Sequence, residues 1–284
     1  MLINIELWMA ACQKLNISYK LYHPDKNLLK IYLGEKSYYF VKITTPFNQQ
    51  SLAKLVLDKE FTYYVLKDWV PMPKTQGFLM PFCEEKYQHY VTHKSFEEIV
   101  TAIVENFSVP VIVKKNSGSR GNNVFLCHNR DEIKLSLEEI FDTNSRSYDY
   151  IALAQEYIQI SQEYRAVFFQ GKLALLYRKN IEDATFAGNL SPLHWEGAKA
   201  EHITDINLIS TIEKFAQPIF QEINLTYCGL DIVIDKQGKY WLIEINSGPG
   251  FGLFVKDNSF EMLVDVFAKM LQDWIDNPSG RTHD

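Results

Sequence analysis

Three side chains that suit metal binding lie on one short segment, residues 229–252, which reads GLDIVIDKQGKYWLIEINSGPGFG. Asp231, Glu244 and Asn246 belong to two β-forming runs around a polar turn, and a glycine-rich stretch that permits close backbone approach follows them. Carboxylate and amide oxygens on rigid strands, with room left for water and phosphate, suit Mg²⁺. The alternative interpretation makes Asp231 and Asn246 polar strand ends and Glu244 a solvent-exposed edge carboxylate.

Whether these three side chains meet depends on the number of residues in the turn. An even number would pair Asp235 with Gly238. Asp231 would then lie opposite Leu242, and all three candidate ligands would share one face, because side chains alternate along a strand. An odd number would turn Asp231 to the other face.

A second candidate site is the segment 111–124, VIVKKNSGSRGNNV, where Lys114 stands at the end of a strand beside a loop of small residues. Backbone N–H groups of such a loop can cradle phosphates, and a lysine ammonium adds a positive charge. The order differs from a Walker P-loop, which ends in GK[ST], and from a protein-kinase loop, whose glycines precede the lysine. A flexible hairpin tip is the alternative interpretation.

A third candidate is the extended run 153–169, LAQEYIQISQEYRAVFF, which carries Glu156, Glu163 and Arg165. Backbone amides of residues 156–158 could pair with the edge of an adenine, and a nearby carboxylate could accept bonds from ribose hydroxyls. A surface strand with the same polar residues is the alternative interpretation.

Short strands joined by hairpins position these segments, and amphipathic helices alternate with them. Residues 48–70 predict one helix that stops before Pro71, and residues 95–107 predict a helix capped by Ser95. A last helix over 259–276 has one apolar face. Because hairpins connect most strands, we expect largely antiparallel sheets and an α+β fold.

Composition excludes several classes of function. The chain has 284 residues, 46% of them hydrophobic, and a net charge of −6, so we expect a folded protein and no nucleic-acid partner. No apolar run is long enough to span a bilayer, and the N-terminal segment reads as an amphipathic helix rather than a signal peptide. The four separated cysteines predict buried thiols in a reducing compartment, which favours the cytoplasm.

Taken in order, these segments resemble the ATP-grasp superfamily, and within it the carboxylate–amine ligases such as the D-alanine–D-alanine ligase, RimK-like, glutathione synthetase and cyanophycin synthetase groups. The resemblance runs from about Asp58 to Phe254, and GLDIVIDKQGKYWLIEINSGPG is its strongest motif. It implies two α+β subdomains that clasp ATP. Their expected ranges are 58–154, with the phosphate loop, and 155–284, with the metal site, after a shortened N-terminal region 1–57.

The resemblance also implies roles for single residues on the nucleotide side. Lys59 and Lys114 would contact the nucleotide phosphates, and the loop 116–123, with Ser117 and Gly118, would close over them. Glu156 and the backbone of Tyr157 and Ile158 would bind the adenine, and Glu163 would bind the ribose. Asp231, Glu244 and Asn246 would bind two Mg²⁺ ions, or Mn²⁺ in their place.

On the substrate side, the resemblance implies that Arg165 and Arg178, together with Lys114, steady the transferred phosphoryl group or the substrate carboxylate. Asn189, Arg178, Ser247 and Gly248 would contact an amino acid or peptide substrate. His194 and Trp195 would line the pocket, with loop packing as the alternative for both.

The implied reaction is attack of a carboxylate on the γ-phosphate of ATP, followed by displacement of phosphate by an amine to form an amide. Phosphoryl transfer demands positioning and charge neutralisation more than a dedicated base. A small-molecule kinase and a regulatory nucleotide-binding protein are the alternatives. An exposed aromatic hairpin at Tyr38, Tyr39 and Phe40 would suit completion by a second subunit in a homodimer.

Overall fold

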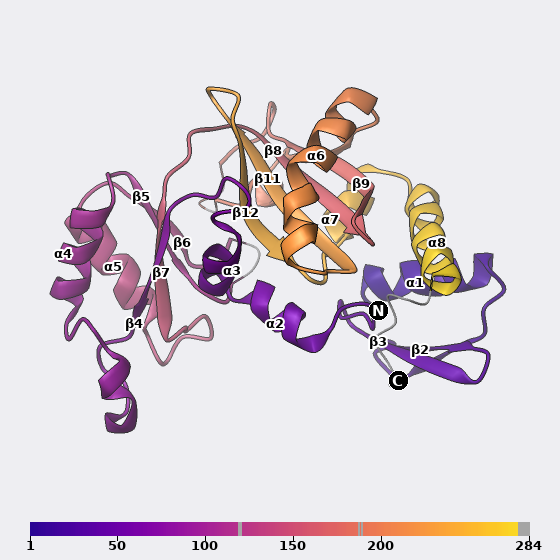
Figure 1. Cartoon of the computed structure of the whole chain (residues 1–284), viewed down its shortest axis with the longest axis horizontal. Coiled ribbons are helices and arrows are strands. Elements are labelled where there is room, and N and C mark those ends of the chain that lie inside the picture. Colours follow the sequence, from indigo (N-terminus) through magenta and orange to yellow (C-terminus); the bar gives the residue numbers. More distant parts are fainter. Residues whose placement is uncertain (119–120, 187, 189, 278–284) are drawn as a thin grey trace.

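The computed structural model describes residues 1–118, 121–186, 188 and 190–277 and builds them around three antiparallel sheets (Figure 1). The strand orders are β1-β2-β3, β4-β7-β5-β6 and β10-β9-β8-β11-β12. The predicted α+β class is confirmed. Across the described part of the chain, no helix is long and apolar enough to cross a membrane.

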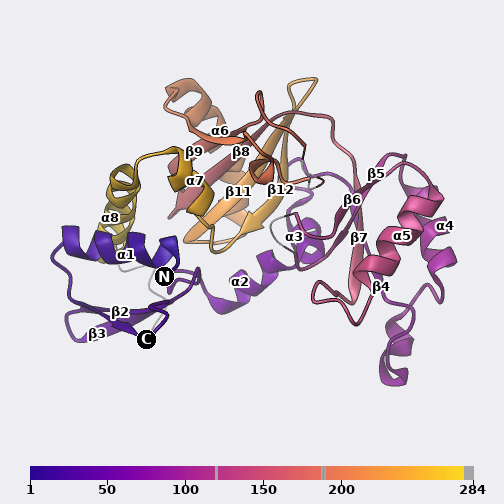
Figure 2. The same ribbon diagram turned by 180° about the vertical axis from the view of Figure 1, so that it is seen from behind.

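The first sheet belongs to an N-terminal unit that the far C-terminal helix completes. Its elements are α1 (Ile3–Lys14), β1 (Tyr19–Tyr22), β2 (Leu28–Leu33), β3 (Lys36–Val41) and α8 (Phe260–Asp276). Both figures place α1 and α8 side by side over this sheet, so helices from distant parts of the sequence pack together (Figures 1 and 2). The ring of Trp8 anchors the unit, with centroids 5.2 Å from Phe40 and 4.4 Å from Phe267.

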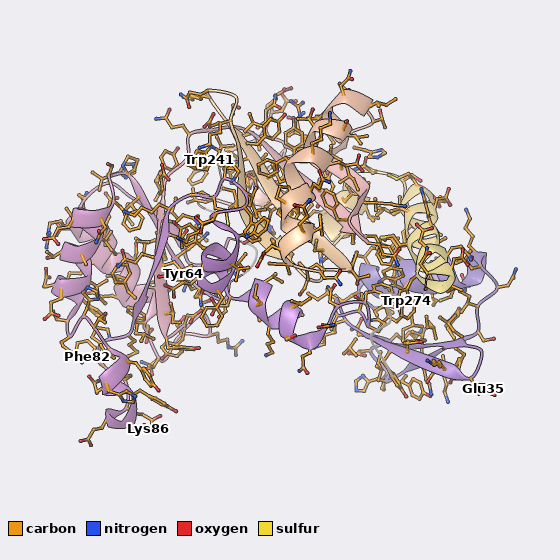
Figure 3. The ribbon with its side chains drawn as sticks, viewed as in Figure 1. Glu35, Tyr64, Phe82, Lys86, Trp241 and Trp274 are labelled. Carbon is orange, nitrogen blue, oxygen red and sulfur yellow. The ribbon has the colours of Figure 1, made fainter. Side chains whose placement is uncertain are left out.

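This packing corrects the prediction of an exposed aromatic hairpin. The Tyr38 ring lies 4.6 Å from the ring of Trp274 in α8, which Figure 3 shows among the side chains of this unit, and Phe40 is buried. Only Tyr39 of the three stays exposed. Because the strand alternates its side chains and the same chain covers the inner face, this hairpin does not call for a second subunit.

The second sheet forms the outer lobe of the molecule. It contains β4 (Thr75–Leu79), β5 (Val111–Lys115), β6 (Val124–Cys127) and β7 (Ile151–Glu156), and α4 (Phe96–Asn106) and α5 (Arg130–Ile140) cover one face. The predicted Ser95 cap is confirmed, because its hydroxyl accepts a hydrogen bond from the Glu98 amide. A short 3₁₀ helix, η1 (Glu85–Tyr90), projects from this lobe.

The third sheet is the largest, and its two faces have different partners. Its strands are β8 (Ile160–Phe169), β9 (Lys172–Asn180), β10 (Lys199–His202), β11 (Tyr227–Asp235) and β12 (Tyr240–Asn246). Helix α6 (Ile206–Glu222) packs on one face through Ile212, Ala216 and Ile219. The opposite face packs in part against the N-terminal unit, whose core it shares.

The single helix predicted over residues 48–70 is wrong, because Asp58 divides it. The structure has α2 (Gln50–Leu57) and α3 (Lys59–Leu66), and Asp58 lies between them in an extended conformation. Its carboxylate accepts a hydrogen bond of 2.8 Å from the Phe61 amide. An aspartate in that conformation starts a new helix rather than continuing the old one, and Lys59 therefore occupies the first turn of α3.

The expected division into ranges 1–57, 58–154 and 155–284 stays a prediction. Strand β7 runs to Glu156, past the expected boundary, and α8 comes from the end of the third range but packs on the first. All four cysteines are free, and Cys83 is partly exposed rather than buried as predicted.

The N-terminal unit also holds the glycine-rich loop 247–252 that follows β12. The Asn48 amide donates to the carbonyls of Tyr227 and Ser247, and its oxygen accepts from the amides of Thr226 and Tyr227. The Asn4 side chain donates to the carbonyl of Pro249 at 2.8 Å. Two asparagines thus satisfy backbone groups that would otherwise lie buried without partners.

We expect Asn48→Ala to lower the free energy of unfolding by about 3 kcal/mol, because it leaves several partly buried backbone groups without a hydrogen-bond partner at once. Chemical denaturation followed by circular dichroism measures the change. Asn106→Ala is the control, since the Asn106 amide donates to an exposed carbonyl of its own helix, and it should cost under about 1 kcal/mol. Equal losses in the two variants would contradict the role assigned to Asn48.

Candidate functional site

The turn between β11 and β12 has an odd number of residues, contrary to the condition set from the sequence. The Asp235 amide donates to the Lys239 carbonyl at 3.0 Å, which leaves three residues, 236–238, in the loop. The Asp235 carboxylate accepts from the amides of Gln237 and Lys239 and from the indole of Trp241. This carboxylate therefore organises the turn, which Figure 3 shows near Trp241.

A β-bulge restores the predicted geometry further along the hairpin. Ile232 pairs with Leu242, but Asp231 pairs with Glu244, so Ile243 is the extra residue. The predicted pairing of Asp231 with Leu242 is wrong. Asp231 and Glu244 are nevertheless direct cross-strand neighbours, and Asn246 lies two residues further on the same face.

Asp231 and Glu244 belong to a row of side chains across four strands. Tyr177, Arg165, Asp231 and Glu244 are paired in that order on β9, β8, β11 and β12. The Arg165 guanidinium binds both oxygens of Asp231, at 2.7 and 2.8 Å. Gly229 makes room for it, since a Cβ there would lie 3.1 Å from Cδ of Arg165.

Sequence reasoning missed Lys179, which lies at the centre of the site. Its ammonium is 3.1 Å from Asp231 and also contacts Glu163 on the neighbouring strand β8. The side chains of Lys179, Glu163 and Asp231 are only 6%, 14% and 6% exposed. Burial alone would raise the pKa of the Asp231 carboxyl, but Arg165 and Lys179 hold it well below its usual range.

The predicted Arg178 is not part of this cluster. It points to the face of the sheet that α6 covers, where its guanidinium binds Glu201 at 2.7 Å and Glu182 at 3.5 Å. Because side chains alternate along β9, its neighbour Lys179 takes the inward position. The alternation of Tyr177 and Lys179 in the sequence 172–180 was the signal that could have identified Lys179.

Two lysines reach the site from outside the large sheet, Lys59 from α3 and Lys114 from the outer lobe. Lys114, at the end of β5, donates to the Gln155 side chain at 2.8 Å, and burial together with the charge of Lys59 lowers its pKa to about 8. Lys59 donates to the Gly118 carbonyl at 2.7 Å and lies 3.7 Å from Glu244. Lys59 therefore already links the small-residue loop to the metal-ligand face.

These groups line one cavity of about 530 Å³ between the outer lobe and the large sheet. It brings together most of the candidate residues of the sequence, namely Lys59, Lys114, Gly118, Glu163, Arg165, Asp231, Glu244, Asn246 and Gly248, and also His194. Asn189 lies outside the described residues.

Other candidates lie beside the cavity rather than in its lining. Ser117 is turned away, because its amide and hydroxyl both donate to Asp149. The Ser247 carbonyl accepts from Asn48. The Trp195 ring packs on Phe186, with centroids 5.2 Å apart, so the packing alternative holds for this residue.

The segment expected to hold adenine is also outside the cavity lining. The Glu156 amide donates to the Lys74 carbonyl at 2.8 Å, and its carboxylate accepts from the Lys74 amide. Both groups of Glu156 are thereby used to extend the pairing of β4 and β7. The assignment of adenine to Glu156 and to the backbone of Tyr157 and Ile158 stays a prediction.

The donor set fits a hard divalent cation. Asp231 and Glu244 are direct cross-strand neighbours on one face, and two carboxylates that lie side by side repel each other unless a cation lies with them. Among the described residues, no three His, Cys, Asp or Glu side chains form a metal centre. Asn246, whose amide donates to Glu244 at 3.0 Å, would supply the third ligand, with water and phosphate completing the shell.

We expect Lys179→Met to lower the free energy of unfolding by about 3 kcal/mol, because it leaves Asp231 and Glu163 buried with less positive charge. Lys134→Met is the matched control, since Lys134 pairs with Glu97 on the exposed surface, and it should cost under about 1 kcal/mol. Urea titration measures both. A Lys179→Met variant as stable as the control would contradict the buried-charge assignment.

Comparison with known proteins identifies the family of the chain. The family model described as the RimK-like ATP-grasp domain matches residues 86–274, about two thirds of the chain. The uncharacterized protein MG012 of Mycoplasma genitalium is 30% identical over 148 residues, which cover 52% of this chain and 46% of that protein. Its Mycoplasma pneumoniae homolog is 28% identical over 155 residues, covering 54% and 49%. The chain thus spans about half the length of these curated relatives.

Solved structures share the fold at low identity. The bifunctional glutathione synthetase of Pasteurella multocida superimposes with a TM-score of 0.58 at 14% identity, covering 96% of this chain and 44% of that one. The D-alanine–D-alanine ligase of Bacillus anthracis complexed with ATP gives 0.53 at 17% identity, covering 78% and 68%. Because the family model matches about two thirds of the chain, this chain belongs to the RimK-like ATP-grasp family.

Proposed function

We propose that the protein is an ATP-dependent ligase that joins a carboxylate to an amine. The observation that carries the proposal is the single cavity in which Lys59 and Lys114 face Asp231, Glu244 and Asn246. Cations and hard oxygen ligands that line one cavity are what a metal-bound triphosphate requires. Free amino acids or short peptides are the substrate class that we propose.

The proposed reaction has two steps. A carboxylate oxygen of the substrate attacks the γ-phosphorus of ATP, and the bond to the β-phosphate oxygen breaks to release ADP. The amine then attacks the acyl carbon and loses a proton, the bond from that carbon to the phosphate oxygen breaks, and an amide and inorganic phosphate form.

The chain's own residues bind and neutralise charge in this scheme. Lys59 and Lys114 would bind phosphate oxygens, and Lys179 and Arg165 would face the transferred group, since both line the cavity beside Asp231. Asp231, Glu244 and Asn246 would hold Mg²⁺, which would neutralise charge on the phosphates. We place the ribose near Glu163 and the adenine near Tyr157 and Ile158.

We expect ADP release to require a carboxylate and an amine together, and mass spectrometry to find their condensed product. Glu244→Gln should lose this activity by at least about a hundredfold, because it removes one charge from the proposed metal ligands. The exposed Glu182→Gln is the control and should keep the wild-type rate. Phosphate left on the acceptor would instead indicate a kinase, and full activity of Glu244→Gln would contradict the metal assignment.

Lys114 should give nucleotide binding a distinctive pH dependence. Burial lowers its pKa to about 8, so the ammonium that attracts phosphate is present below pH 8 and is lost as the pH rises above it. We expect the Kd for a non-hydrolysable ATP analogue, measured by calorimetry, to rise by up to about tenfold per pH unit above 8. Lys114→Arg should flatten this rise, because arginine stays protonated. Equal slopes for the two proteins would contradict the assignment.

A further inference from the structure

The inner face of the large sheet divides into a charged half and an apolar half. The inward side chains of β8 run from Glu163, which contacts Lys179, through Arg165, which pairs with Asp231, to Val167, which pairs with Gly229. Beyond that pair, Phe169 and Tyr227 pack into the core of the N-terminal unit. The cavity therefore ends where the N-terminal unit begins.

One side chain of the N-terminal unit enters the cavity at this border. Ile43 follows β3 and lines the cavity, although its side chain is 46% exposed. A tight turn holds it, with reciprocal hydrogen bonds of 2.9 Å between the backbones of Val41 and Thr44 and a left-handed conformation at Lys42.

The glycine-rich loop fixes Ile43 against the rest of the site. A Cβ on Gly248 would lie 2.6 Å from the Ile43 carbonyl oxygen, so only glycine permits this approach. Gly248, Gly250 and Gly252 all line the cavity. The position of Ile43 therefore depends on the same loop that follows the metal ligand Asn246.

The other walls at this end are also aliphatic. Leu193 lines the cavity and packs against the core shared by the N-terminal unit and the large sheet, and Leu253 lines it from the start of α7 (Gly252–Asp257). Leu190 completes the set, and His194 and Ser191 are its polar members. The Asp, Glu, Lys and Arg side chains in the described lining come instead from the large sheet, α3 and the strand end and loop 114–122.

We propose that this end of the cavity is a subsite that binds an aliphatic or aromatic side chain of the substrate, and that Ile43 determines the specificity of this subsite. The proposal rests on the ligase function proposed above and names its substrate class: an amino acid or dipeptide with an apolar side chain. A charged side chain would lose its water against Ile43, Leu193 and Leu253 without gaining a partner of opposite charge.

Ile43→Glu tests the subsite, and Val41→Glu is its matched control. Val41 belongs to the same turn and is also 46% exposed, but it does not line the cavity. ADP release would be measured with leucine, phenylalanine, glutamate and lysine and with their glycyl dipeptides. We expect wild type and Val41→Glu to prefer leucine and phenylalanine by at least about tenfold in kcat/KM, and Ile43→Glu to lose this preference through a higher KM.

A binding measurement separates failure of the subsite from failure of the ligase. The shift in Tm would be recorded for the same compounds with Mg²⁺ and a non-hydrolysable ATP analogue. Shifts with leucine and phenylalanine that disappear in Ile43→Glu, without ADP release from ATP, would support the subsite and contradict the ligase. ADP release that favours glutamate or lysine, equal behaviour of the two variants, or no Tm shift with any compound would overturn the subsite.

Discussion

Charge neutralisation on one face of the large sheet is the constraint on which the rest of the site depends. Asp231, Glu163 and Glu244 project from neighbouring strands toward one cavity, and like charges at that distance would repel. Arg165 and Lys179 neutralise the first two, and Lys59 reaches Glu244 from α3. Helix α3 thus contributes to the charge balance of the large sheet, and Lys59 also bonds the Gly118 carbonyl of the outer lobe, which links the two.

The same balance explains how the site would accept a nucleotide. Each cation that now pairs with a carboxylate or a carbonyl could turn to a phosphate, once a divalent cation takes over the carboxylates. Lys59 already contacts one group of each kind, because it donates to the Gly118 carbonyl and lies close to the Glu244 carboxylate. On this proposal, the cations that form ion pairs in the free protein are the same ones that would contact the phosphates of a metal-bound triphosphate.

The N-terminal unit sets the other boundary of the cavity. It buries Trp8, Phe47 and Tyr227 in a common core with the large sheet, and its asparagines bind the backbone of the loop after β12. A short unit can therefore do two things at once: it covers the apolar end of the sheet, and it places Ile43 beside the glycine-rich loop. The family match begins only at residue 86, so this wall of the cavity comes from a part of the chain outside it.

The sequence by itself determined most of the elements, because alternation, capping residues and turn glycines are local signals. It predicted the family, which is confirmed, and it selected Asp231, Glu244, Asn246, Lys59 and Lys114, which line one cavity and whose roles stay predictions. Only the tertiary structure decided the register of β11 and β12. The bulge at Ile243 compensates for the odd number of turn residues, so that Asp231 lies opposite Glu244, and no local sequence pattern indicates this bulge. The tertiary structure also decided that Lys179 rather than Arg178 faces the cavity and that Ile43 closes it, because both depend on which surface a distant element covers.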